Sequence, residues 1–244
     1  MNLKRTFATM LRVLTQLRRD RRTLALIIFV PSLLLVILNY VFEGNPKMFN
    51  AVAPMILGII PFTLMFIVTS VAVLRERTSG TLERLIISPA SRLDILFGYA
   101  GAFALLAFLQ ASLASFIITV VLNVPIFGNT ASILLMAVLA GILGMSLGLL
   151  FSAFAKNEFQ AVQFMPAFVL PQFLTSGLFT PRSDMAPFLR YFSDIMPITY
   201  VVDSMKLIQA NATWTSKLYF DISVIIGFII ASLVLGAWSL RPRG

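Results

Sequence analysis

Residues 75–89 read Arg75-Glu-Arg-Thr-Ser-Gly-Thr-Leu-Glu-Arg-Leu-Ile-Ile-Ser-Pro89, a charged segment between two long apolar runs. Reversing a chain takes only a few polar residues, and this segment is longer than that. Thr81 can cap a helix, Glu83 would lie in its first turn, and Pro89 would end it. The apolar positions of this helix fall on one face: Leu82, Leu85 and Ile86. The charged segment therefore predicts a short amphipathic helix at about residues 81–88.

The composition indicates an integral membrane protein. Of 244 residues, 59% are hydrophobic, whereas soluble domains contain about 45–50%. The chain has no cysteine and no histidine, which excludes disulfides and thiol catalysis and leaves only carboxylates for a zinc site. We expect an all-α membrane protein whose single transmembrane domain covers residues 1–244.

Six apolar stretches are long enough to cross a membrane, because about 20 helical residues span the hydrocarbon core. They are residues 23–41, 53–74, 96–122, 132–155, 159–179 and 219–240. The first is too long for the apolar region of a signal peptide, so we interpret it as a retained signal-anchor.

The distribution of Lys and Arg gives the orientation of these spans. Fourteen of the 19 basic residues fall on the side of both termini and of the charged segment. The ten acidic residues divide evenly between the two sides, so the net charge of +9 is a positive-inside bias. We therefore expect a multi-pass protein of the cell membrane with both termini in the cytoplasm.

Residues 1–22 combine apolar periodicity with a basic face. The apolar positions recur at helical spacing: Leu3, Phe7, Met10, Leu14 and Leu17. This pattern is typical of a helix in the membrane interface. A basic anchor with incidental helicity is the alternative.

The middle of each span lacks charged residues, and the chain has no GxxxxGK phosphate-binding loop. Ion-driven transporters use intramembrane ionisable groups to couple transport to a gradient. If this protein moves a cargo uphill, the energy must therefore come from outside the chain.

Two spans have distinctive small residues or prolines. The fourth carries a small residue at every fourth position: Ala140, Gly144, Gly148 and Ser152. This ridge favours close helix packing, within a bundle or across a dimer, over chance in an apolar sequence.

The fifth span contains Pro166 and Pro171, and Gly177 follows it. Proline leaves backbone carbonyls without partners, which favours a position facing the bundle interior or a cavity. The residues that would line such a pathway are Pro166, Pro171, Phe173, Gly177 and Phe179. A purely structural kink is the alternative.

Residues 180–217 are too polar to cross the membrane but keep helical apolar periodicity. Asp184 is a candidate N-cap for a first short helix that ends at Pro197, and a second follows from Thr199 to about Ile208. We expect two re-entrant outer helices that dip back on the bundle as a lid. A solvated loop is the alternative.

The sequence resembles type-2 ATP-binding-cassette exporter permeases, the daunorubicin-resistance and polysaccharide-export type, over essentially its whole length. One patch that carries the resemblance runs from Glu76 through Gly80-Thr-Leu-Glu-Arg-Leu85 to Ser88-Pro89, Arg92 and Gly98. The other runs from Pro171 through Ser176-Gly-Leu-Phe179 to Pro197-Ile-Thr-Tyr200 and Asp203.

The resemblance implies a permease subunit that is not itself an enzyme. It would pair with a second copy or a homologous permease and with separate ATPase subunits, which would bind ATP and Mg²⁺, so this chain would hold no cofactor or metal. The helix in the charged segment would be the coupling helix, seated on the ATPase. Residues implied in this coupling are Glu76, Gly80, Thr81, Leu82, Glu83, Arg84, Leu85, Ile86 and Pro89.

The cargo is less defined. With 22 Phe and 11 Met but only 2 Trp and 5 Tyr, the composition favours a hydrophobic or amphipathic drug-like molecule over a glycan, which aromatic stacking would recognise. Export of a lipid-linked glycan or envelope lipid is the alternative within this class. A stand-alone channel or gradient-driven transporter and a membrane-embedded enzyme or scaffold are the alternatives outside it.

Overall fold

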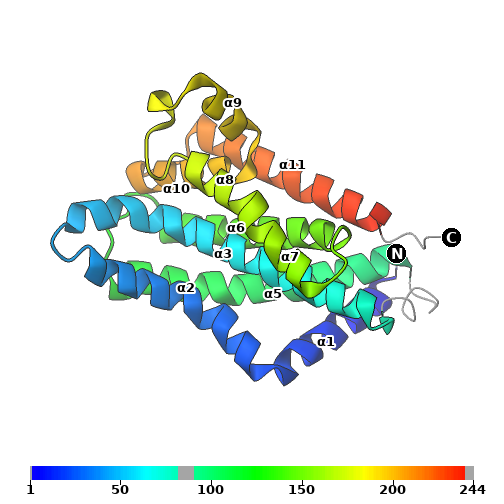
Figure 1. Cartoon of the computed structure of the whole chain (residues 1–244). Helices are drawn as coiled ribbons and strands as arrows, with labels where there is room; N and C mark the ends of the chain where they lie inside the picture. The colour runs from blue at the N-terminus through cyan, green and yellow to red at the C-terminus, as the bar shows by residue number, and fades with distance from the viewer. Residues whose placement is uncertain (1, 82–90, 240–244) are drawn as a thin grey trace.

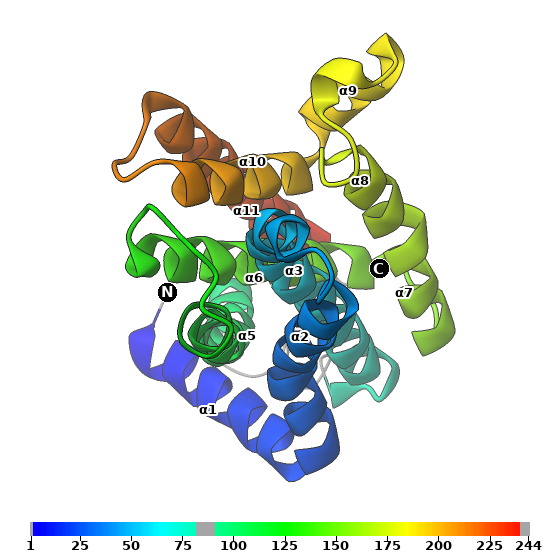
Figure 2. The same ribbon diagram turned by 90° about the vertical axis from the view of Figure 1, so that its left-hand side faces the viewer.

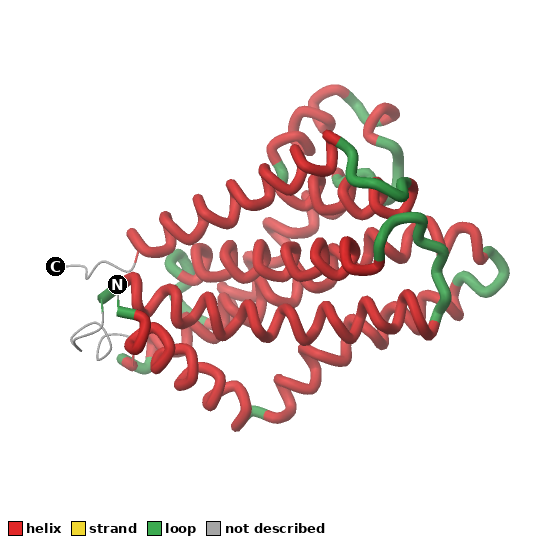
Figure 3. Tube along the Cα trace, turned by 180° about the vertical axis from the view of Figure 1, so that it is seen from behind, coloured by secondary structure: helices red, strands yellow, loops and turns green. Residues whose placement is uncertain are grey.

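The structure is a computed structural model that describes residues 2–81 and 91–239. Over this part of the chain all elements are helices, joined by turns at the ends of the bundle (Figure 1, Figure 3). The long helices are α1 (Leu3–Arg19), α2 (Arg21–Val41), α3 (Pro46–Thr78), α5 (Arg92–Phe116), α6 (Thr130–Ser152), α10 (Pro197–Ala210) and α11 (Ser216–Ser239). The short ones are η1 (Ile117–Val121), α7 (Glu158–Phe164), η2 (Met165–Val169), α8 (Leu170–Thr175), η3 (Arg182–Asp184) and α9 (Pro187–Ile195).

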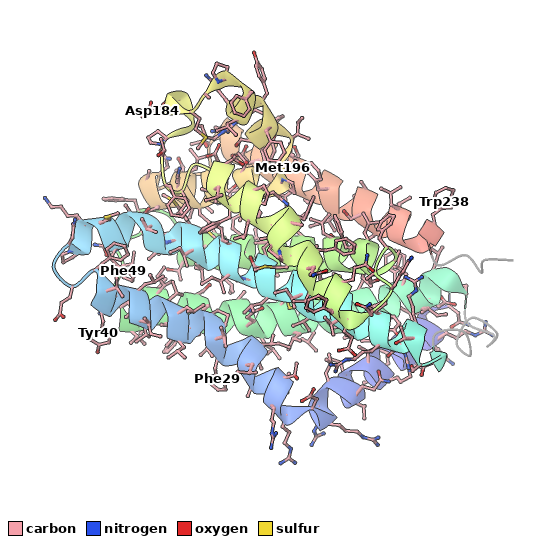
Figure 4. All side chains as sticks on the ribbon, viewed as in Figure 1. Phe29, Tyr40, Phe49, Asp184, Met196 and Trp238 are labelled. Atoms are coloured by element: carbon pink, nitrogen blue, oxygen red, sulfur yellow. The ribbon has the colours of Figure 1, made fainter. Side chains whose placement is uncertain are left out.

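Five of the six expected spans are confirmed as helices long and apolar enough to cross a membrane: α2, α3, α5 with its continuation η1, α6 and α11. Outward-facing apolar side chains such as Phe29 and Tyr40 on α2 and Trp238 on α11 fit a lipid environment (Figure 4). The 33 residues of α3 extend over roughly 50 Å, well beyond the hydrocarbon core of about 30 Å. α3 is therefore longer than a straight crossing of the hydrocarbon core requires.

The expected fifth span, residues 159–179, is three helical pieces in direct succession. α7 leads into the π-turn η2, which contains Pro166, and α8 follows. The prolines explain the break, because each removes a backbone donor from the i→i−4 ladder. Gly177, with a φ of +86°, follows directly after α8 and turns the chain.

α3 lies at the centre of the bundle, surrounded by α2, α5, α6, α7 and α10 (Figure 2). Its closest neighbour is α6, on which Ala140, Gly144, Gly148 and Ser152 are all buried. A Cβ atom at Gly144 would overlap the carbonyl group of Phe62, and one at Gly148 would lie 2.5 Å from the carbonyl oxygen of Phe66. The small-residue ridge of α6 therefore packs on α3 of the same chain.

The outer helices differ from the expected lid in one respect. α10 packs into the core through residues such as Ile198, Val201 and Met205, as expected for a helix that returns to the bundle. On α9, in contrast, Phe188 is 70% exposed and Ile195 is 65% exposed.

Asp184 lies in η3, and Ala186 takes the N-cap position of α9, so the expected Asp184 cap is wrong. A proline at the first position of α9 makes a side-chain cap less necessary.

The glycine contact between α6 and α3 gives a direct prediction. Gly144→Ala should destabilise the chain by about 1–3 kcal/mol, because the new methyl group forces the two backbones apart. Thermal unfolding in detergent measures the difference. Gly227→Ala is the matched control, since no atom lies within 4 Å of a Cβ at that position. Equal stability of the two variants would show that the backbones do not depend on this contact.

Candidate functional site

Three successive residues at the end of α3 contact three different elements. The Arg75 guanidinium donates from Nε and Nη2 to the two carboxylate oxygens of Glu158 on α7, at 2.8 and 2.9 Å. Glu76 accepts from Nη2 of Arg12 on α1 at 2.9 Å. Arg77 donates from Nη1 to the carbonyl of Ser152, where α6 ends, at 2.7 Å. Successive helical residues point about 100° apart, so one turn of α3 can join α7, α1 and α6.

Gly80 terminates α3. Its φ of +71° is a left-handed conformation that glycine adopts without strain. Its backbone N–H donates to the carbonyl of Arg77 at 3.3 Å, and the N–H of Ser79 donates to the carbonyl of Arg75 at 3.0 Å. These bonds satisfy carbonyls at the helix end, so the charged segment leaves α3 in a defined direction.

The other end of the charged segment leads into a capping box that opens α5. Ser91 Oγ accepts from the Asp94 N–H at 3.1 Å, and the Asp94 carboxylate accepts from the Ser91 N–H at 3.0 Å. These two reciprocal bonds form a capping box, for which Ser91 and Asp94 have the required three-residue spacing. Asp94 also accepts from the backbone N–H of Asn2 at 2.7 Å and is 99% buried, so it joins the start of α1 to the start of α5.

α1 therefore contacts the chain near the start of the charged segment and beyond its end. Arg12 bonds to Glu76, the second residue of the segment, and donates to the Tyr99 hydroxyl after it, at 2.7 Å. Met10, Leu14 and Leu17 pack on the core, whereas Leu3 and Phe7 are exposed. The expected helix at residues 1–22 is present as α1, with only part of its apolar face turned toward the bundle.

The coupling residues predicted from the sequence are placed only in part. Glu76 is bonded to α1, Gly80 ends α3, and the Thr81 hydroxyl lies 3.0 Å from that of Ser79. The others, which would form the coupling helix itself, lie outside the described residues: Leu82, Glu83, Arg84, Leu85, Ile86 and Pro89.

The pathway candidates lie along the broken helix and just beyond it. Pro166 is exposed within η2, and Pro171 is half-buried near the start of α8. The rings of Phe173 and Phe179 meet edge to face with centroids 5.1 Å apart. Phe179 is 63% exposed. On the same helix Pro166, Leu170 and Leu174 are exposed in this single chain.

A charged cluster that joins the segment after α8 to α9, α10 and α11 was not expected from the sequence. Arg182 pairs with Asp194 on α9 and with Asp203 on α10, and Lys217 on α11 lies 3.1 Å from the same Asp203. The Lys206 ammonium donates to the carbonyl of Gly177 at 2.6 Å. Burial lowers the pKa of Lys206, and the nearby Asp203 partly opposes this effect. Equal numbers of acids and bases on this side were the available signal, but they do not show which residues pair.

The sequence profile of the family described as ABC-2 type transporter matches residues 4–210. ABC transporter G family member 20 of Dictyostelium discoideum is 27% identical over 204 residues, which cover 82% of this chain and 28% of that protein.

Two bacterial relatives are similar over comparable lengths. Probable multidrug ABC transporter permease YbhR of Escherichia coli K12 is 28% identical over 208 residues, covering 73% of this chain and 56% of the relative. Linearmycin resistance permease protein LnrN of Bacillus subtilis 168 is 20% identical over 185 residues, covering 74% and 48%. The chain thus matches between about a quarter and about half of the length of these relatives.

The Asp94 contacts give a prediction about α1. Asp94→Asn leaves one acceptor oxygen for three donors from Asn2, Ser91 and Thr6. We expect a loss of roughly 1–3 kcal/mol in stability and faster tryptic cleavage within α1. Thermal unfolding and limited proteolysis measure the two effects. Glu43→Gln, at an exposed position far from this contact, is the control, and unchanged cleavage in Asp94→Asn would contradict the anchoring role.

Proposed function

Because the chain belongs to the ABC-2 type transporter family, we propose that it is the non-catalytic membrane subunit of an ATP-driven exporter. A separate ATPase subunit supplies the energy, and a second copy of this chain or a homologous permease completes the membrane part. The observation that carries the proposal is the attachment to α1 of both the end of α3, through Glu76, and the start of α5, through Asp94 and Tyr99.

An ATPase can move a permease only through a firm attachment. A force on the charged segment acts on α3 and α5 together, because Arg12 and Asp94 join both helices to α1. The spans themselves carry no charged residue at their centres that could couple transport to an ion gradient. The coupling helix at about residues 81–88 is the part of the chain that we propose contacts the ATPase.

We further propose six spans, with α7, η2 and α8 together forming the fifth, and both termini in the cytoplasm. The start of α1 and the end of α11 lie at the same end of the bundle as the end of α3 (Figure 1). Fourteen of the 19 basic residues belong to this side in such a topology. This charge distribution favours a protein of the cell membrane whose basic side, with both termini, faces the cytoplasm.

The cargo that we propose is a hydrophobic or amphipathic small molecule. Two relatives carry names that refer to multidrug transport and to linearmycin resistance. The exposed apolar face around η2 and the Phe173–Phe179 pair suits an adaptable apolar path between two subunits.

Reconstitution with the co-expressed ATPase tests the coupling proposal. The wild-type complex should transport cargo only with ATP. Leu82→Asp/Leu85→Asp should reduce the retained ATPase by at least about tenfold, because buried apolar contacts dominate such interfaces. Phe127→Asp, at a residue 75% exposed in the outer connection, controls for an added charge. Full ATPase retention and transport in the double variant would contradict the coupling role.

The aromatic pair gives a separate prediction for the pathway. An edge-to-face aromatic contact contributes about 0.5–1.5 kcal/mol, so Phe173→Ala/Phe179→Ala should change transport of an aromatic cargo by roughly two- to tenfold. ATPase retention should stay unchanged. Relative resistance to a panel of compounds measures the effect, with Phe220→Ala on α11 as control. If the Phe173→Ala/Phe179→Ala variant and the Phe220→Ala control gave the same resistance profile, these two residues would not belong to the pathway.

A further inference from the structure

α7 attaches to the bundle mainly beside the last turns of α3. A small apolar cluster joins the two helices, formed by the buried residues Leu74, Ala155 and Ala161 with Val71 and Phe164 packed against it. Arg75, which pairs with Glu158, directly follows Leu74 of this cluster along α3. The cytoplasmic half of the broken helix is therefore positioned by the end of α3.

The ion pair fixes orientation more than it adds stability. Two parallel bonds, of 2.8 and 2.9 Å, join the guanidinium fork to both carboxylate oxygens, and this geometry constrains direction as well as distance. Glu158 is the first residue of α7, and Asn157 caps that helix through the Gln160 N–H. Both charged side chains are at least half exposed, so the pair contributes little to folding.

The outer half of the same helix is held by a different element. Gln172 on α8 is fully buried, and its Oε1 accepts from the backbone N–H of Ile198 on α10 at 3.4 Å. Its Nε2 donates to the carbonyl of Phe168 at 3.0 Å. α8 is therefore attached to α10, whereas α7 is attached to α3.

Between the two halves lies η2. A π-turn interrupts the regular hydrogen-bond ladder, and Pro166 removes a further donor from it. Bends in helices concentrate at such positions. α7 and α8 are thus attached to different helices, and the π-turn lies between them. This arrangement allows α7 to act as a lever that bends at Met165–Val169.

We propose that Arg75 and Glu158 are positioning residues that carry movement of the charged segment into α7, which bends against α8 at η2. This inference rests on the proposed function, since an ATPase is the source of that movement. The ion pair lies at the start of α7, about two turns before the hinge. A small rotation of the end of α3 would therefore turn α7 and change which side chains of η2 face the proposed pathway. Neither residue contacts cargo or nucleotide.

Charge reversal and charge exchange in the complex with the co-expressed ATPase test this role. Arg75→Glu and Glu158→Arg should each lower transport per ATP hydrolysed by about tenfold, while the amounts of inserted chain and retained ATPase stay at wild-type levels. The exchanged pair, Arg75→Glu with Glu158→Arg, should restore transport to within about threefold of wild type. Lys156→Gln, next to α7, is the control for a changed charge without a changed pair.

A distance measurement separates positioning from a general structural role. The chain has no cysteine, so spin labels can be placed at Phe159→Cys on α7 or Leu174→Cys on α8, each paired with Leu109→Cys on α5. These three positions are exposed. Adding ATP to the complex should shift the Phe159 distance and leave the Leu174 distance nearly unchanged, and Glu158→Arg should abolish the shift.

The outcomes distinguish this inference from the function on which it rests. A wild-type complex without ATP-dependent transport overturns the proposed function, and the lever with it. If the wild-type complex transports cargo with ATP but each single reversal also transports normally, the lever alone is overturned. The same holds if the exchanged pair inserts and binds the ATPase but does not recover transport. Equal ATP-dependent shifts at Phe159 and Leu174 also overturn it, because the helix then moves as one rigid piece.

Discussion

The close approach of α6 to α3 is the contact on which the rest of the bundle depends. In lipid, helices associate through packing rather than through the hydrophobic effect, and Gly144 and Gly148 let α6 lie directly on the backbone of Phe62 and Phe66. This contact keeps α3 at the centre of the bundle (Figure 2). From there α3 contacts α10, and its last turn bonds to α1, α6 and α7.

The central position of α3 explains why three successive charged residues at its end can contact α7, α1 and the end of α6. Arg75, Glu76 and Arg77 lie in the last turn of α3, where their side chains bond to three neighbouring elements. Asp94 and Tyr99 provide the matching attachments at the start of α5. The proposed attachment point for the ATPase lies between α3 and α5, next to these contacts.

Local features were predictable from the sequence, and contacts between distant residues were not. The five long spans, α1, α10 and the Ser91–Asp94 capping box follow from periodicity and spacing within single segments. The ion pairs of Arg75 with Glu158 and of Arg12 with Glu76 join residues 83 and 64 positions apart, and many other charged residues could have formed such pairs. The exposed face of α9 was also missed, because apolar periodicity predicts a helix but does not say what covers it. The prolines indicated a break in the fifth span, but the π-turn that results depends on the packing of its neighbours.

The most direct test of the account is an electron cryomicroscopy structure of the chain purified with its ATPase. The account predicts that residues 81–88 form a helix seated on the ATPase, with the Arg12–Glu76 and Asn2–Asp94 contacts intact on either side of it. An ATPase bound elsewhere on the chain, with residues 81–88 free of contact, would contradict it.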